Sequence, residues 1–327
     1  MFDRNFGFLR YMKGTVYKST GSWYSVKAES GAFYACRIKG KFRLEGIKST
    51  NPIATGDHVT FSIDQQGDQA QGVITAIAPR DNYIIRKSVN LSKQTHIIAA
   101  NIDVAFLLIT PNNPVTTTAF IDRFLVTAEA YHIKCVLLFN KTDDYDNDSL
   151  DEVKYLAALY RSIGYECIGI SAKTGKNIDQ VKALMKNKVS MFSGHSGVGK
   201  STLVNALAPN LALRTSEISL QHAQGQHTTT FAEMFDLPFG AQIIDTPGIK
   251  GFGLVAIDNQ ELSAYFPEFF ALKDQCKFNN CLHVNEPNCA IKNALEKDEL
   301  AWSRYKSYLQ IMEGDDQVYR KDQHQEI

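Results

Sequence analysis

The most chemically specific stretch of the sequence is a glycine-rich run after an apolar segment. It reads Gly194-His195-Ser196-Gly197-Val198-Gly199-Lys200-Ser201 and continues with Thr202. Glycines at this spacing let backbone N–H groups wrap phosphate oxygens, while the lysine reaches the β and γ phosphates and the serine hydroxyl ligates Mg²⁺. A helical pattern begins near Lys200, so the positive N-terminal end of that helix would face the same phosphate groups. The run predicts a nucleoside triphosphate site but does not choose between ATP and GTP.

A second motif, Asn140-Lys141-Thr142-Asp143, makes that choice. A carboxylate at Asp143 accepts hydrogen bonds from guanine N1–H and from the exocyclic amine, and adenine has no donors arranged in that way. We expect Asn140 to fix the loops and touch the base, and the Lys141 stem to lie over the ring. Such a site rejects the wrong base because mispairing leaves buried polar groups unsatisfied.

Two further motifs follow strand-like runs. They are Ser171-Ala172-Lys173 and Asp245-Thr246-Pro247-Gly248. We expect Ala172 to offer its backbone N–H to guanine O6, Asp245 to lie near Mg²⁺ and the Gly248 N–H to contact the γ-phosphate. Ligands of open α/β sheets bind beyond the carboxyl ends of the strands, so all four motifs are predicted at one edge of a sheet.

The loop Gly225-Gln226-His227-Thr228-Thr229-Thr230 lies between the phosphate loop and Asp245. We expect a threonine of this loop to close over Mg²⁺ when the γ-phosphate is present. Thr229 is our first choice, with its two neighbouring threonines as alternatives. The predicted magnesium ligands are therefore Ser201, Thr229 and Asp245.

The residue after Gly248 is Ile249, where Ras-type enzymes place the glutamine that orients the attacking water. Isoleucine neither donates nor accepts, so intrinsic hydrolysis is expected to be slow. His227 is our hypothesis for the group that positions water; its alternative roles are holding the loop or contacting RNA. The predicted catalytic set is His227, Thr229, Lys200 and Gly248.

A cluster of metal-ligand types lies near the C-terminus. Cys276, Cys281, His283 and Cys289 supply four soft or imidazole ligands in fourteen residues. That number and type predict a closed, tetrahedral and structural Zn²⁺ site, one per chain. His222 is expected to be a solvated loop residue, and the three scattered cysteines are expected to be inert.

Length and pattern predict three domains in this chain of 327 residues. Short β-prone runs in residues 1–78 suggest a small all-β barrel as the first domain. Residues 79–258 alternate strand-like and helical runs, which favours a mainly parallel sheet covered by helices, after a linker at Pro79 to Arg86. Residues 259–327 contain the cysteine cluster and a helical pattern from Ala290 to Met312.

The total charge is zero but unevenly spread. Residues 1–78 have ten Lys or Arg against six Asp or Glu, and residues 259–327 have eight against twelve. Basic residues between Arg37 and Lys48 lie near aromatic ones, a combination that holds RNA in small barrels, although a solvated basic face is the alternative. No apolar run approaches the roughly 18–20 residues that cross a bilayer. We expect no signal peptide and no membrane partner. We also expect a cytoplasmic location and a monomer.

The order of the motifs is itself informative. Ordinary GTPases place the phosphate loop first, whereas here the guanine motif and Ser171-Ala172-Lys173 precede it. With Gly56-Asp57-His58-Val59, Asn101-Ile102-Asp103, Ile121-Asp122-Arg123 and the cysteine cluster, nearly the whole chain resembles the circularly permuted, ribosome small-subunit-dependent GTPase A family of bacterial assembly factors. The resemblance implies an OB barrel, a permuted P-loop GTPase domain and a zinc-binding helical domain. It also implies binding to the rRNA and proteins of the small subunit and hydrolysis of GTP to GDP there.

Two other functions use the same nucleotide motifs. A GTP-dependent kinase would need an acceptor pocket and a base, for which no carboxylate candidate follows the motifs. A GTP-regulated signalling module would bind only proteins, which the basic barrel disfavours. We therefore expect a GTPase that acts in late small-subunit maturation and is stimulated by the subunit.

Overall fold

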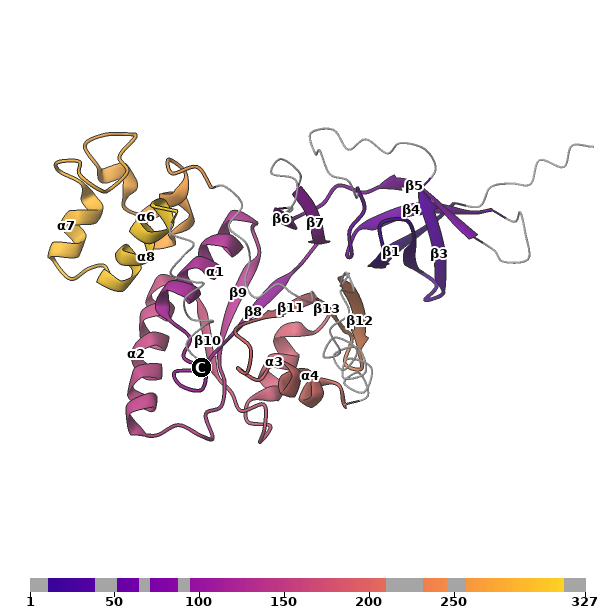
Figure 1. Cartoon of the computed structure of the whole chain (residues 1–327), viewed down its shortest axis with the longest axis horizontal. Coiled ribbons are helices and arrows are strands. Elements are labelled where there is room, and N and C mark those ends of the chain that lie inside the picture. Colours follow the sequence, from indigo (N-terminus) through magenta and orange to yellow (C-terminus); the bar gives the residue numbers. More distant parts are fainter. Residues whose placement is uncertain are drawn as a thin grey trace, which may run out of the picture. The chain divides into compact units, whose positions relative to one another are not determined.

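The computed structural model describes residues 11–38, 52–64, 71–87, 95–209, 232–245 and 257–314. These residues form two compact units. The first unit contains the described parts of Met1–Asp103, Met185–Met191 and Ile218–Gly248, and the second contains those of Val104–Leu184, Phe192–Glu217 and Ile249–Ile327 (Figure 1). None of the described helices is long and apolar enough to cross a membrane.

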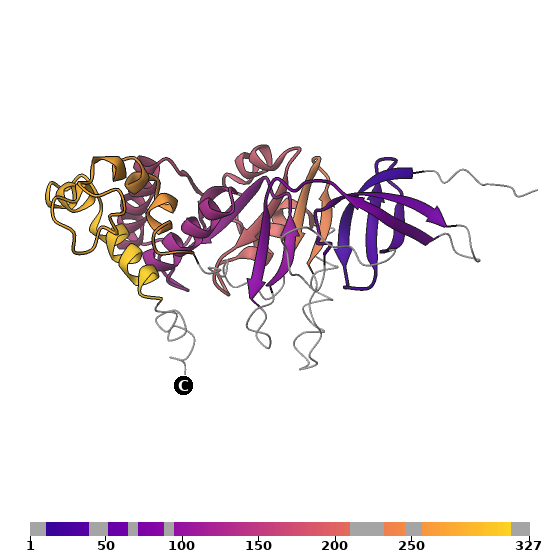
Figure 2. The same ribbon diagram turned by 90° about the horizontal axis from the view of Figure 1, so that it is seen from above.

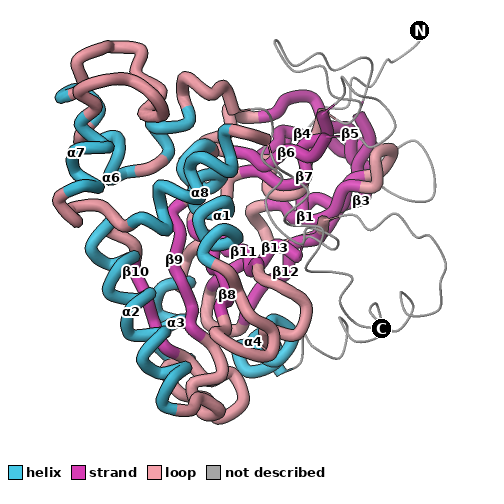
Figure 3. Tube along the Cα trace, turned by 60° about the vertical axis from the view of Figure 1, so that its left-hand side comes forward, coloured by secondary structure: helices cyan, strands magenta, loops and turns pink. Residues whose placement is uncertain are grey.

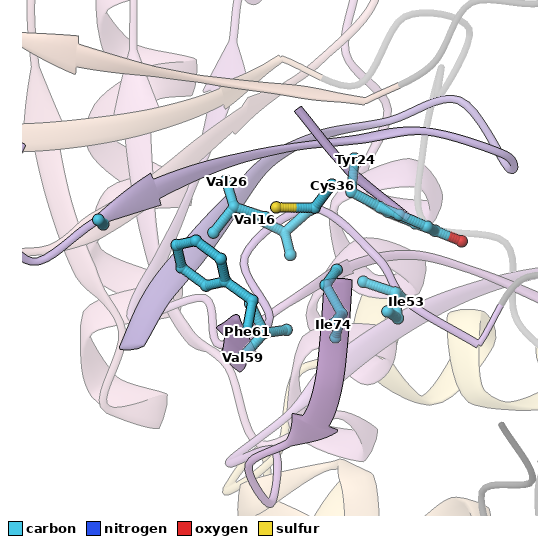
Figure 4. Packing of buried hydrophobic residues seen from close by; sticks show 9 residues of the cluster. Val16, Tyr24, Val26, Cys36, Ile53, Val59, Phe61 and Ile74 are labelled. Carbon is cyan, nitrogen blue, oxygen red and sulfur yellow. The ribbon is translucent and has the colours of Figure 1, made fainter. Parts of the chain in front are cut away.

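The N-terminal part of the first unit is the expected small barrel. Its strands are β1 (Tyr11–Ser19), β2 (Tyr24–Ala28), β3 (Phe33–Ile38), β4 (His58–Asp64) and β5 (Gln71–Ile77). They run in the order β1-β2-β3-β5-β4, and pairing of β1 with β4 closes the barrel. Alternating residues point inward, so Val16, Val26, Phe61 and Ile74 pack in a core that excludes water (Figure 4). The predicted OB-like barrel is confirmed.

The rest of the first unit differs in two places from what the sequence predicts. The predicted linker Pro79 to Arg86 is in part a strand, because β6 (Tyr83–Lys87) pairs antiparallel with β7 (Thr95–Ala100) and buries Ile84. The unpredicted strand β12 (Glu233–Leu237) runs antiparallel to β13 (Ala241–Asp245) and also pairs with β1. The strand β11 (Val189–Ser193) lies parallel to β13, as expected.

The second unit has the alternating order of a parallel α/β fold. Its strands β8 (Val104–Ile109), β9 (Lys134–Phe139) and β10 (Glu166–Gly169) lie parallel in the order β10-β9-β8. The helices are α1 (Thr118–Ala130), α2 (Asn147–Ile163), α3 (Ile178–Met185) and α4 (Lys200–Leu207). Thr117 and Asp146 cap α1 and α2 by accepting backbone N–H bonds, and Gly164 ends α2 in the left-handed conformation. The predicted alternation is confirmed.

The C-terminal part of the second unit consists of short helices joined by loops (Figure 3). They are η1 (Leu262–Tyr265), α6 (Pro267–Phe270), η2 (Lys273–Gln275), α7 (Ala290–Glu296) and α8 (Trp302–Met312). The single helical pattern predicted from Ala290 to Met312 is two helices, and Asp298 lies between them with a positive φ of 58°. Phe266, Phe269 and Tyr308 pack in one core with Val126 of α1, so this part is joined to α1 (Figure 2).

Candidate nucleotide site and metal centre

The phosphate loop occupies the turn between β11 and α4, and its glycines have conformations that other residues adopt only with strain. Gly194, Gly197 and Gly199 have φ values of 141°, 83° and 99°. A Cβ on Gly194 would lie 2.7 Å from the Leu108 carbonyl oxygen, and one on Gly199 would lie 2.4 Å from Asn140 Nδ2. Both positions therefore require glycine, for conformation and for space.

The backbone N–H groups of the loop and the Lys200 ammonium are arranged as in an anion-binding site. Lys200 Nζ donates to the carbonyl oxygens of Gly194 at 2.5 Å and His195 at 2.7 Å, so its ammonium lies within the loop. Gly199 is the N-cap of α4 and no side chain caps that end, which leaves the first-turn N–H groups to face an anion. Ser201 and Thr202 are exposed on the same turn.

The loop is also fixed to α1. The His195 ring packs on Phe120 with ring centroids 4.0 Å apart and a tilt of 32°. Val198 is fully buried, while Ser196 and Gly197 are exposed. The loop therefore has one side held by the fold and the other open to solvent.

Asn140 joins three of the predicted motifs. Its side chain is 2% exposed. Nδ2 donates to the Val198 carbonyl at 2.7 Å, and Oδ1 accepts the Ala172 N–H at 3.0 Å. One buried amide thus connects the guanine motif to the phosphate loop and to Ser171-Ala172-Lys173. The Ala172 N–H, which we expected to meet guanine O6, is engaged by Asn140 in this structure.

Asp143 lies at the open side of this arrangement. Its carboxylate accepts the Ser171 hydroxyl at 2.5 Å, and the Ser171 oxygen in turn accepts the Thr174 N–H at 3.1 Å. The hydrogen bond from Ser171 is the main reason that the pKa of Asp143 lies below its ordinary value. Asp143 is exposed, whereas Ser171 is fully buried, so a rigid hydroxyl holds an accessible carboxylate in its ionised form.

The other residues of the two base-side motifs lie around Asp143. Lys141 has a φ of 68°, and its Nζ donates to the Asn113 carbonyl at 2.5 Å. Thr142 donates its backbone N–H to Ile170 at 3.1 Å, and Lys173 is exposed. Three motifs that are far apart in the sequence therefore lie together in the second unit.

Asp245 is the exposed last residue of β13 and belongs to the first unit. Several residues singled out in the sequence lie outside the described residues. They are His227, Thr228, Thr229, Thr230, Gly248, Ile249 and His222. The roles that the sequence suggests for these residues stay predictions.

The cysteine cluster forms one compact group of ligand atoms. The ligand atoms of Cys276, Cys281, His283 and Cys289 all lie within 4.8 Å of one another. His283 Nδ1 is 3.6 Å from the Cys276 sulfur and 3.4 Å from the Cys289 sulfur. These spacings match the separation of about 3.6 Å expected between ligands of a tetrahedral ion with bonds of about 2.0–2.3 Å. The four residues can hold a metal ion.

The loop that carries His283 is held from two sides. Tyr305 and Tyr308 of α8 donate their hydroxyls to the carbonyls of His283 at 2.7 Å and Leu282 at 2.8 Å. The Glu286 carboxylate accepts the N–H groups of Leu282, Val284 and Asn285. Burial lowers the pKa of His283, which favours the neutral imidazole that binds metals. The ligand positions are thus set by the surrounding fold.

Comparisons with known proteins bear on this arrangement. The sequence profile of the RsgA GTPase family matches residues 77–255, and that of the RsgA N-terminal domain matches residues 13–74. The small ribosomal subunit biogenesis GTPase RsgA of Christiangramia forsetii is 70% identical over 96% of this chain and 100% of its own length. The chain belongs to the RsgA GTPase family.

Other members of the family agree. The protein of the same name from Bacteroides fragilis is 53% identical over 92% of this chain and 96% of its own length. The crystal structure of YjeQ from Thermotoga maritima has a TM-score of 0.76 at 36% identity and covers 93% of this chain and 98% of that one. YloQ, described as a circularly permuted GTPase, has a TM-score of 0.72 at 29% identity over 99% of this chain and 100% of that one. The predicted family, permuted fold and GTP hydrolase class are confirmed.

Sequence reasoning missed a buried charge network in this RsgA family member. Arg304 of α8 donates to Asp122 Oδ1 at 2.7 Å and to both oxygens of Glu268 at 2.6 and 3.1 Å. Tyr160 of α2 also donates to Asp122, at 2.7 Å. The available signal was a carboxylate, Asp122, among the apolar residues that α1 buries. The network joins α1 and α2 to the C-terminal helices.

A second missed group holds the barrel to the next strands. Arg80 donates to both oxygens of Asp57 at 2.6 Å and to the Pro52 carbonyl at 2.8 Å. A Cβ on Gly56 would lie 2.0 Å from the Ala100 carbonyl oxygen, so the chain passes β7 in close contact. The motif Gly56-Asp57-His58-Val59, noted only as part of a resemblance, therefore has a structural reason.

Proposed function

We propose that the chain binds GTP at the pocket formed by Asp143, Asn140 and the loop Gly194–Ser201, and hydrolyses it to GDP and phosphate. The observation that carries this proposal is the position of Asn140, whose buried amide connects the base-side motifs to the phosphate loop. One rigid group then fixes the distance between the two ends of the nucleotide, which is the positioning that phosphoryl transfer depends on.

Base recognition in this proposal depends on the ionised Asp143. The Ser171 hydroxyl orients the carboxylate and stabilises its charge, so both oxygens face the guanine N1–H and exocyclic amine as acceptors. Guanine O6 would share the Ala172 N–H with Asn140 or replace Asn140 as its acceptor. Lys141, fixed by the Asn113 carbonyl, would lie along the ring face.

Phosphate binding uses the backbone and Lys200. The ammonium, held in the loop by two carbonyls, would move to the β and γ phosphates, and the first-turn N–H groups of α4 would donate hydrogen bonds to the remaining phosphate oxygens. From the motifs we assign Ser201, Thr229 and Asp245 to Mg²⁺, and Ser201 fits because it is exposed next to Lys200. Mg²⁺ bound there would neutralise charge on the phosphate oxygens.

We assign the positioning of the attacking water to His227, because Ile249 has no polar group for that task. In the same proposal the Gly248 N–H contacts the γ-phosphate and Thr229 closes over the site. If His227→Ala retains full turnover with small subunits, that assignment is wrong.

The partner is proposed to be the small ribosomal subunit, with its rRNA and proteins, during late maturation. Support comes from the relatives named small ribosomal subunit biogenesis GTPase RsgA and from the basic barrel. We also propose a cytoplasmic location, a monomer, and domains at residues 1–78, 79–258 and 259–327. We assign Zn²⁺ to the cluster of Cys276, Cys281, His283 and Cys289 as a structural ion, because sulfur and imidazole ligands select it.

The decisive experiment is phosphate release from GTP with and without purified small subunits, at low and high salt. We expect strong stimulation at low salt that weakens as salt rises, because phosphate contacts with RNA are screened. Lys200→Ala should abolish turnover, whereas Lys186→Ala, which removes an exposed lysine outside the pocket, should leave it unchanged. Absence of stimulation at low salt would contradict the proposal.

A further inference from the structure

The loop between β8 and α1 contacts both halves of the nucleotide pocket. On the side of the guanine motif, the Asn113 carbonyl accepts a hydrogen bond from Lys141 Nζ at 2.5 Å. On the side of the phosphate loop, Pro114 is close to Gly197, since a Cβ on Gly197 would lie 3.6 Å from Pro114 Cδ. Two adjacent residues of one loop therefore lie against two motifs that are far apart in the sequence.

This loop is closed on itself by hydrogen bonds. The Thr110 hydroxyl donates to the Pro114 carbonyl at 2.5 Å, and the Thr110 carbonyl accepts the Thr116 N–H at 2.9 Å. The Thr116 hydroxyl in turn accepts the Thr110 N–H at 3.2 Å. Thr110 and Thr116 are buried, and Thr117 caps α1 directly after the loop. The loop therefore presents a fixed surface to the two motifs.

The first turn of α1 extends this support with an aromatic ring. Phe120 packs on the His195 imidazole with ring centroids 4.0 Å apart and a tilt of 32°, and both side chains are partly buried. The next two residues, Ile121 and Asp122, are fully buried, and Asp122 accepts the Tyr160 hydroxyl at 2.7 Å. The backbone that carries Phe120 is therefore held in place by the core behind it.

The position of the His195 side chain affects the phosphate loop because its backbone is part of the anion site. The His195 carbonyl accepts Lys200 Nζ at 2.7 Å. The glycines of the loop permit many backbone conformations, so contacts with the rest of the fold must select the one that wraps phosphate. Val198 is fully buried, and its carbonyl accepts the Asn140 amide. Phe120 and Asn140 thus hold the loop at two separate points.

We propose that Phe120 is a positioning residue for GTP binding, because its ring keeps the phosphate loop in the conformation that accepts the β and γ phosphates. This role rests on the proposed function, since it takes the loop as the GTP site. Phe120 acts through His195 and does not itself touch the nucleotide. Without the ring, a smaller fraction of the molecules has a loop ready to bind, and the affinity falls by that fraction.

The test measures binding of the fluorescent nucleotide methylanthraniloyl-GDP to the full chain in the presence of Mg²⁺. Phe120→Ala should raise the dissociation constant about three- to tenfold, as expected for the loss of one aromatic contact. Phe120→Tyr keeps the ring and should bind within about twofold of the parent. Tyr131→Ala is the matched control and should bind as the parent does. Tyr131 is a partly buried aromatic residue at the other end of α1, roughly 16 Å along the helix from Phe120.

A double-mutant cycle shows whether the ring acts through His195. His195→Ala should weaken binding by about the same factor as Phe120→Ala. The double variant should bind no more weakly than either single variant, because all three lack the same contact. Steady-state hydrolysis provides a second readout. KM for GTP should rise with the dissociation constant while kcat stays within about twofold, because bound phosphates hold the loop themselves.

Several results would overturn the role of Phe120. They are unchanged binding by Phe120→Ala, an equal loss in Tyr131→Ala, losses that multiply in the double variant, and a lower kcat at unchanged KM. If Phe120→Ala does not fold, His195→Ala decides from the loop side, where a loss supports the role and unchanged binding overturns it. A parent chain that does not bind the labelled GDP would instead contradict the proposed function, whatever the variants give.

Discussion

Replacing Arg304 with methionine is the sharpest test of how the second unit is held together. Arg304 is 1% exposed and Asp122 is fully buried, so solvent does not screen their interaction. Burial lowers the pKa of Arg304, but the charges of Asp122 and Glu268 outweigh it and raise the pKa, so the guanidinium stays cationic. Methionine fills similar volume without charge and leaves both carboxylates without their cation.

The expected cost follows from these contacts. Removing one partner of a buried ion pair costs about 3–5 kcal/mol. Among the described residues Asp122 Oδ2 has no hydrogen-bond partner, so in Arg304→Met only the Tyr160 hydroxyl would still stabilise that carboxylate. We therefore expect a loss in the free energy of unfolding of about 4 kcal/mol. Tyr160→Phe removes a single hydrogen bond to a charged group and should cost about 1.5–3 kcal/mol.

Urea unfolding measured by tryptophan fluorescence provides the assay. In a Trp23→Phe background the reporter is Trp302, whose ring lies 5.4 Å from that of Tyr305 on α8. The matched control is Lys306→Met, which removes an exposed cation from the same helix and should cost less than about 0.5 kcal/mol.

The double variant Arg304→Met with Asp122→Asn should recover part of the loss, because it removes the uncompensated carboxylate charge. The reasoning is refuted if Arg304→Met is within about 1 kcal/mol of Lys306→Met. It is also refuted if neutralising Asp122 makes Arg304→Met less stable still.

Three further predictions concern the two sites. Asp143→Asn should abolish the preference for GTP over ATP in calorimetry, whereas Asp144→Asn, at an exposed neighbouring position, should keep it. In the parent the preference should persist from pH 8 to pH 5, because the lowered pKa of Asp143 keeps its carboxylate ionised as the pH falls. Gly199→Ala should weaken GTP binding more than tenfold, while Gly175→Ala, with a similar φ of 83° but open space, should retain it in the same titration. Cys289→Ala should remove the bound zinc measured by mass spectrometry of the metal, and Cys36→Ala should retain one ion per chain.

Much of the proposed chemistry can be predicted from the amino-acid sequence alone. Gly194–Ser201 and Asn140–Asp143 carry their functional groups at fixed local spacing, and the order of the motifs alone indicates permutation. The ligand set around His283 is equally local, because four residues within fourteen positions need only one turn of loop to meet. The strand-like runs of residues 79–258 could be recognised because buried parallel strands, such as Val104–Ile109, are continuous apolar runs.

The contacts between these motifs could not be predicted, because they depend on how the whole chain folds. That Asn140 would bond both Val198 and Ala172 depends on which strands are neighbours, and so on long-range pairing that local pattern does not encode. The same reason explains why β12 and the Arg304–Asp122 pair were missed, since each is stabilised by partners distant in the chain. The spacing of residues along the chain determines which chemical groups a motif brings together. The partners of those groups depend on how the whole fold packs, because every segment contributes to the burial of the others.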